Sequence, residues 1–170
     1  MERNGIITMH GNPLTLVGNE VKAGEKAPDF SVVDSGLSNK SLADYKGKIK
    51  LISVTPSLDT PVCDLQINRF EKDATDLSSD VVVLNISADL PFAIKRFCSG
   101  GGIDMVSALS DHRSVSFGEA YGVLIKELRL LARSIFVIDK DDIVRYVQVV
   151  NEQTNEPDYD AAIEAVKSAL

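Results

Sequence analysis

Residues 50–77 read KLISVTPSLDTPVCDLQINRFEKDATDL. The first six, residues 50–55, include three apolar and three β-branched side chains, which is typical of a buried strand. From residue 61 onward the apolar residues recur mostly at steps of three and four, which predicts an amphipathic helix over 61–77. A strand, a short loop and a helix in this order form the first half of a βαβ unit, so the stretch predicts an α/β fold.

The segments on both sides continue the alternation of strands and helices. Residues 81–87 begin with a continuous apolar run, Val81 to Leu84, typical of a strand buried on both faces. Pro91 opens a helix over 91–97 that we expect the glycines at 100–102 to end. The other expected elements are a hairpin of residues 5–9 and 14–17 turning at 11–13, strands at 30–33 and 105–109, a helical turn at 41–45, a short helix at 115–121, a strand pair at 134–139 and 143–150, and a closing helix at 159–170. We therefore expect a thioredoxin-like fold, in which helices flank a central mixed β-sheet, with an N-terminal β-hairpin.

The composition is that of an ordinary globular domain. The chain has 170 residues, 44% of them hydrophobic and 25% charged, so we expect residues 1–170 to form a single domain. The net charge of -7 and the absence of a Lys/Arg run argue against a nucleic-acid partner. The apolar runs are too short to cross a bilayer, and residues 1–4 do not begin a secretory signal. We therefore expect no membrane partner and a cytoplasmic location.

The chain contains two cysteines, Cys63 and Cys98, and two histidines, His10 and His112. No spacing among them is typical of a tetrahedral zinc site, and we expect no cofactor. A chain of this size in a reducing compartment does not need a permanent disulfide. The cysteines are therefore either reactive groups or two inert buried thiols.

Cys63 falls in the first turn of the predicted helix. Thr60 is a suitable N-cap, whose hydroxyl can accept from free backbone N–H groups, and Pro61 suits the first helical position. The sulfur then lies near the positive end of the helix dipole, which favours the nucleophilic thiolate. Lowering a thiol pKa by about two units takes roughly 2.7 kcal/mol, whereas the dipole contributes roughly 0.3–1 kcal/mol, so a cation must also contribute. These signals alone leave a small core cysteine as an equal alternative.

The segment that ends at Cys63 matches the pattern Pro-x-x-x-Thr-x-x-Cys of peroxiredoxin active sites, with Pro56 and Thr60 in the other two positions. Further stretches, from residue 11 to the C-terminus, resemble the thiol peroxidase branch of that family in its atypical two-cysteine form. These stretches are GNPL at 11–14, GEKAPDF at 24–30, DLPFA at 89–93, RFC at 96–98, LLAR at 130–133 and EPDY at 156–159.

This resemblance implies a hydroperoxide substrate and a role for each of five residues. Cys63 would be the peroxidatic cysteine, whose thiolate attacks the O–O bond and becomes a sulfenic acid. Thr60 would hold the thiolate and the peroxide with its hydroxyl, Pro56 would shield the site from bulk water, and Arg133 would supply the cation. Cys98 would resolve the sulfenic acid as an intramolecular disulfide with Cys63, which thioredoxin would reduce. The family also implies a homodimer.

The segment after Cys98 reads SGGG, residues 99–102, where the thiol peroxidase branch more often carries Gly-Ala-Glu-Gly. Glycine is conformationally permissive, and a disulfide requires Cα atoms roughly 4.4–6.8 Å apart. Local unwinding at these glycines would let Cys98 reach a distant Cys63. The difference in sequence at 99–102 therefore concerns the rate of disulfide formation and not the role of Cys98.

The residues themselves also allow plainer interpretations. Arg133 could be an ordinary strand-start arginine that reaches solvent, and Cys98 could be a buried apolar thiol. Arg96, Arg113 and Arg129 are weaker candidates for the active-site cation. Two other functions stay open: a redox sensor, in which a partner protein recognises the shape change that the disulfide causes, and a non-catalytic thioredoxin-like interaction domain.

Overall fold

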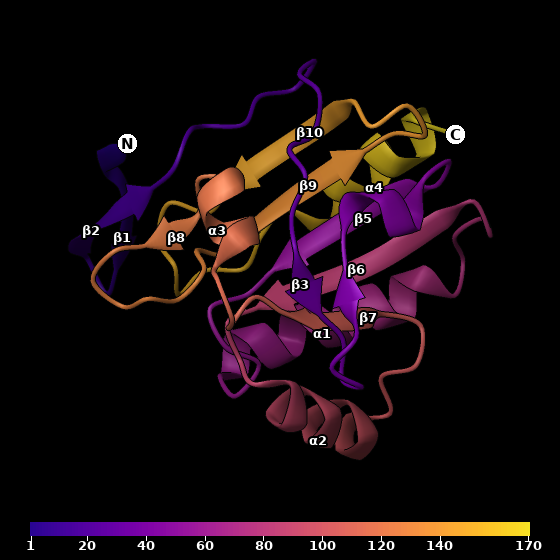
Figure 1. Cartoon of the computed structure of the whole chain (residues 1–170), viewed down its shortest axis with the longest axis horizontal. Helices are drawn as coiled ribbons and strands as arrows, with labels where there is room; N and C mark the ends of the chain where they lie inside the picture. Colours follow the sequence, from indigo (N-terminus) through magenta and orange to yellow (C-terminus); the bar gives the residue numbers. More distant parts are fainter.

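A seven-stranded mixed sheet forms the centre of the structure (Figure 1). The computed structural model describes residues 1–170. The strands, in order across the sheet, are β10 (Val144–Val149), β9 (Ser134–Ile138), β5 (Ile49–Val54), β6 (Val81–Ser87), β7 (Ser107–Ser110), β3 (Val32–Val33) and β4 (Asn39–Lys40). The pairs β5–β6 and β6–β7 are parallel, and all other pairs are antiparallel. The predicted central mixed sheet is therefore confirmed.

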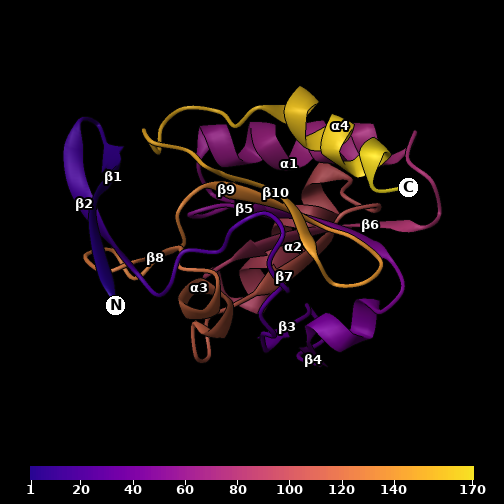
Figure 2. The same cartoon turned by 90° about the horizontal axis from the view of Figure 1, so that it is seen from above.

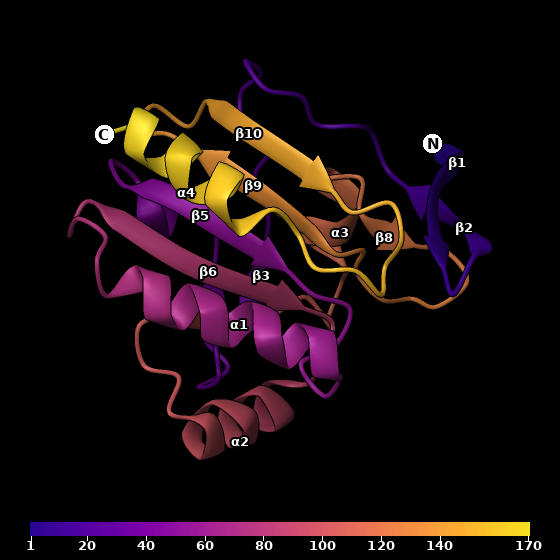
Figure 3. The same ribbon diagram turned by 180° about the vertical axis from the view of Figure 1, so that it is seen from behind.

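Helices cover both faces of this sheet. The helices are α1 (Pro61–Ala74), α2 (Pro91–Gly101), α3 (Ser116–Ala120) and α4 (Tyr159–Ser168), with a 3-10 turn η1 at Leu42–Tyr45. Helices α1 and α4 lie on one face, and α3 and η1 on the other (Figures 2 and 3). Successive side chains of β5 point to opposite faces of the sheet. Leu51 packs in the hydrophobic cluster that includes residues of α1 and α4, and Ile52 packs in the cluster that includes residues of α3 and η1. No helix combines the length and the hydropathy that a membrane span needs.

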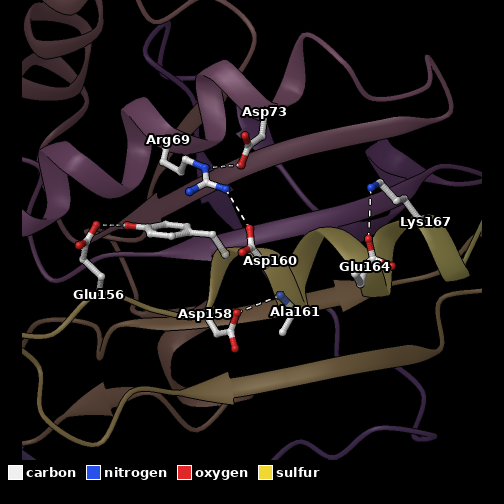
Figure 4. Close-up of polar contacts among 9 residues, drawn as sticks. Arg69, Asp73, Glu156, Asp158, Asp160, Ala161, Glu164 and Lys167 are labelled. Atoms are coloured by element: carbon white, nitrogen blue, oxygen red, sulfur yellow. Dashed lines mark hydrogen bonds and ion pairs between the residues drawn. The ribbon is translucent and has the colours of Figure 1, made fainter.

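Helix α1 is fixed against α4 at its middle (Figure 4). The Arg69 guanidinium contacts Asp73 at 2.9 Å on its own helix and Asp160 at 3.0 Å on α4. It also lies over the Tyr159 ring, 5.1 Å from the centroid, and the buried Phe70 ring meets the same tyrosine edge-on. These contacts hold the axis of α1, and so define where its first turn lies.

The predicted N-terminal hairpin is present as β1 (Glu2–Met9) and β2 (Asn12–Val17), which form a second sheet with β8 (Leu124–Ile125). Its turn, however, lies at His10 and Gly11, both with positive φ, and not at 11–13. Pro13 is instead a strand residue opposite Thr8. Proline is tolerated there because β8 pairs only with the far end of β2.

Other boundaries differ from the prediction where the local signal is weak. The strands expected at 30–33 and 105–109 are Val32–Val33 and Ser107–Ser110, and α1 ends at Ala74 and not at residue 77. No sequence pattern predicted the two-residue strands β4 and β8. The largest difference is in α2, which continues through the first two of its three glycines. Only Gly102, with φ of 68°, leaves the helix, and it donates its N–H to the Cys98 carbonyl. Cys98 therefore lies inside the helix and not after it.

Candidate active site

Cys63 is the third residue of α1 and is fully buried, with 0% of its surface exposed. As predicted, Thr60 is the N-cap and Pro61 the first helical residue. The predicted capping bond is wrong: the Thr60 hydroxyl donates to the Ser57 carbonyl at 3.1 Å, because it turns back toward its own loop. The backbone N–H groups of Val62 and Cys63 donate to no acceptor within the protein. They remain available to an anion or an oxygen beside the sulfur.

Arg133 lies directly before β9, and its guanidinium reaches the sulfur of Cys63. Its Nη2 donates to Cys63 Sγ at 3.4 Å, its Nη1 to Gln66 Oε1 at 2.8 Å, and its Nε to the Gln153 carbonyl at 3.0 Å. The residue is only 3% exposed, so the interpretation of an arginine that reaches solvent is wrong. Arg96, Arg113 and Arg129 are all exposed and do not contact the sulfur.

The charge of Arg133 has no carboxylate partner. None of the ion pairs of the structure includes it, and its other two acceptors are neutral amide oxygens. A guanidinium stays protonated in proteins, and a buried charge is costly unless it is paired. Among the groups in contact with this guanidinium, only the sulfur of Cys63 can become an anion. The sulfur is therefore the one group beside this buried charge that could carry a compensating negative charge.

Two buried glutamines hold Arg133 in place, and the sequence prediction missed both. Gln66, one turn after Cys63, is 0% exposed and donates its amide to Ser53 Oγ at 2.7 Å, which turns its oxygen toward Arg133. Gln153, 1% exposed, accepts from the Arg133 N–H and donates to the Val150 carbonyl. The position of Gln66, three residues after Cys63 on the buried helix face, was a usable signal. Gln153 lies in a polar loop and had none.

The loop between β5 and α1, residues 55–60, is held by a carboxylate from the next strand end. Asp89 accepts from Ser57 Oγ at 2.7 Å and from the Leu58 N–H at 2.8 Å. Pro56 is buried within this loop, whereas Asp59 is exposed. Asp89 therefore joins the segment before Cys63 to the segment that leads into α2.

Cys98 is not brought together with Cys63. Both are free thiols, and Cys98 is partly exposed on α2. A groove of about 560 Å³ lies between the loop at Leu58 and the α2 residues Ala93 and Phe97. Burial raises the pKa of Cys98, and the nearby Glu71 carboxylate raises it further. Both influences favour the protonated form of the Cys98 thiol, which is not bonded to Cys63 in this arrangement.

Comparison with known proteins identifies the family. The redoxin family model matches residues 22–163. The chain belongs to the redoxin family. It is 59% identical to the thiol peroxidase of Bacillus subtilis over 164 residues, which cover 96% of this chain and 98% of that protein. The thiol peroxidase of Halalkalibacterium halodurans is 57% identical over the same share of both chains. The suspected thiol peroxidase branch is thus confirmed, and the protein is a peroxiredoxin-type peroxidase.

The fold of this peroxidase is also that of a solved relative. The crystal structure of a peroxiredoxin-like protein from Aquifex aeolicus superposes with a TM-score of 0.91 at 41% identity, over 98% of this chain and 99% of that one. The predicted thioredoxin-like α/β fold is therefore confirmed.

Proposed function

We propose that this peroxidase reduces hydrogen peroxide and organic hydroperoxides at Cys63. The observation that carries the proposal is the buried Arg133, which has no carboxylate partner and places Nη2 at 3.4 Å from Cys63 Sγ. The thiolate attacks one oxygen of the peroxide and the O–O bond breaks. The leaving alkoxide or hydroxide takes a proton from solvent and departs as an alcohol or as water. Cys63 is left as a sulfenic acid.

The groups around the sulfur suit this step. Arg133 stabilises the anion before attack and has its charge available to the peroxide oxygens as negative charge moves onto the leaving oxygen. The free N–H groups of Val62 and Cys63 provide further donors beside the sulfur. Thr60 would join them once its hydroxyl turns from the Ser57 carbonyl to the substrate, and the buried Pro56 would help to exclude bulk water.

Cys98 completes the cycle in this proposal. Its thiol attacks the sulfur of the Cys63 sulfenic acid, water leaves, and an intramolecular disulfide forms. Because Cys98 lies inside α2, the helix must first unwind, and the glycines at 100–102 lower the cost of doing so. Unwinding also takes Cys98 away from the burial and the Glu71 charge that raise its pKa, so it becomes easier to ionise when it is needed.

The reductant in this scheme is a dithiol protein, thioredoxin, which reduces the disulfide by exchange. Relatives with the name thiol peroxidase support a thiol reductant, and the chain has no CxxC pair of its own. We place the reaction in the cytoplasm and expect the chain, one domain over 1–170, to act as a homodimer.

Turnover with a recycling reductant tests the proposal against the redox-sensor alternative. With peroxide, thioredoxin, thioredoxin reductase and NADPH, the wild type should consume peroxide continuously. Cys63→Ser should abolish consumption, and Cys98→Ser should undergo one oxidation per chain without turning over. Normal turnover by Cys98→Ser would contradict the resolving role, and normal turnover by Cys63→Ser would contradict the whole scheme.

A further inference from the structure

The N-terminal hairpin is attached to the loop that follows β10. Thr8 donates its backbone N–H to the Asn151 carbonyl at 2.7 Å, and its carbonyl accepts from the Gln153 N–H at 2.8 Å. Figures 2 and 3 show this loop reaching out from the main sheet toward β1 and β2. The backbone of the hairpin thus pairs with the residue that also bonds to the active-site arginine.

Glu152 reinforces this attachment from the loop side. Its carboxylate accepts from the Thr8 hydroxyl at 2.8 Å and from the backbone N–H groups of His10 and Gly11, both at 3.0 Å. It also accepts from the Thr154 hydroxyl at 2.8 Å. The bonds from Gly11 and Thr8 are the main reason why the pKa of Glu152 falls to about 2. One carboxylate, ionised at any physiological pH, therefore joins the turn of the hairpin to the loop.

The next residue, Gln153, bonds away from the hairpin. Its side-chain oxygen accepts from the Arg133 N–H, and its carbonyl accepts from Arg133 Nε at 3.0 Å. Glu152 thus binds the hairpin and Gln153 binds the arginine. A shift of the loop at Glu152 would carry Gln153 with it, and the guanidinium would lose its alignment with Cys63 Sγ.

We propose that Glu152 is a positioning residue of the peroxidase, which clamps the N-terminal hairpin to the loop so that Gln153 holds Arg133 against Cys63. This inference rests on the proposed role of Cys63 as the peroxidatic thiolate. The competing interpretation is that Glu152 only stabilises the hairpin. The two differ in one readout, the pH dependence of Cys63 reactivity, which a purely structural role leaves unchanged.

The test uses the full chain with Cys98→Ser, so that Cys63 is the only thiol. The rate of Cys63 alkylation by iodoacetamide is measured across a range of pH, and the rate of oxidation by hydrogen peroxide is measured at neutral pH. Glu152→Ala should move the alkylation profile toward higher pH by about one unit and slow peroxide oxidation about tenfold, since one pH unit corresponds to a tenfold change in thiolate. Glu152→Gln, which keeps one acceptor oxygen, should give a smaller shift.

Glu127, which follows β8, offers a matched control because its carboxylate contacts the same hairpin from another segment. Its carboxylate accepts from the Thr15 N–H of β2 at 3.0 Å, but it has no bond to the loop or to Gln153. Glu127→Ala should leave both the profile and the oxidation rate unchanged. Thr8→Val, which removes a single hydroxyl donor and so disturbs the fold least, should shift the profile in the same direction as Glu152→Ala but by less.

An unshifted profile in a folded Glu152→Ala or Thr8→Val protein would overturn the inference. Equal shifts for Glu152→Ala and Glu127→Ala would also overturn it, because they would mean that general loosening of the hairpin is sufficient. The oxidation rate of the parent Cys98→Ser protein distinguishes a failure of the proposed function from a failure of the proposed role of Glu152. A slow parent contradicts the proposed function, whereas a fast parent with an equally fast Glu152→Ala contradicts only the role of Glu152.

Discussion

Arg133→Met removes the cation that contacts Cys63 Sγ and keeps an unbranched side chain in the buried space. Three donated bonds are lost, to the sulfur at 3.4 Å, to Gln66 Oε1 at 2.8 Å and to the Gln153 carbonyl at 3.0 Å. Of these, only the bond to the sulfur distinguishes the thiolate from the thiol by charge. Its loss therefore determines how much the ionisation of Cys63 changes.

The magnitude follows from the burial of this contact. A hydrogen bond to a charged group contributes roughly 1.5–3 kcal/mol, and both side chains are almost completely buried, so solvent screens little of it. This range corresponds to a roughly 10- to 150-fold slower reaction of Cys63 with an electrophile at neutral pH. At neutral pH the rate of peroxide reaction should fall at least as much, because in the proposed mechanism Arg133 also stabilises the leaving oxygen.

The assay is the pH profile of Cys63 alkylation in Cys98→Ser protein, with and without Arg133→Met, quantified by mass spectrometry. Arg96→Met is the control, since Arg96 is exposed on α2 and does not contact the sulfur. We expect the Arg133 variant to react at higher pH than the parent and the Arg96 variant to match the parent. Superimposable profiles for all three proteins would refute the reasoning, because the sulfur would then not depend on the guanidinium.

Three further predictions concern the segments around the site. Asp89→Ala removes the acceptor that holds loop 55–60, which should cost about 1.4 kcal/mol of loop stabilisation and accelerate disulfide formation after peroxide about tenfold. Rapid acid quench with mass spectrometry measures the rate of disulfide formation, and a slower rate would contradict the role of Asp89 in holding the loop. Burial raises the pKa of Asp111 from 3.8 to about 6, so the native state binds more protons than the unfolded chain in this window and its stability falls as pH rises through it. Urea titrations give the free energy of unfolding of the wild type and of Asp111→Asn at each pH. The stability advantage of the wild type over Asp111→Asn should decline from pH 3.8 to about 6 and stay level above that range. An advantage that increases with pH would contradict this prediction. Phe70→Ala should lower the free energy of unfolding by about 3–5 kcal/mol, since the ring is fully buried against Tyr159; a loss below about 1 kcal/mol in thermal unfolding would mean that α1 is held mainly by other contacts.

The elements that carry the site could be predicted because their signals are local. A buried strand, a loop and a proline at the first helical position place Cys63 in the first turn of α1, and the structure agrees. The contact with Arg133 could not be derived in this way, since the register between β5 and β9 brings the two residues together across a sequence distance of 70. Only the family resemblance suggested it.

Other details depend on tertiary context that no local pattern encodes. The glycines at 100 and 101 favour a helix end by propensity, yet both remain in α2 and only Gly102 adopts the left-handed conformation. The Thr60 hydroxyl had two acceptable partners, and the shape of the loop selected the Ser57 carbonyl. Gln153 became part of the site because the hairpin and the loop after β10 pair with each other.

Mass spectrometry after one equivalent of hydrogen peroxide tests the central claim most directly. The reduced wild type should lose two hydrogens and yield a peptide pair joined through Cys63 and Cys98. The Cys98→Ser variant should gain a single oxygen on Cys63, trapped with a sulfenic-acid reagent. An oxygen found first on Cys98, or a Cys63 that stays a free thiol while peroxide disappears, would contradict the account.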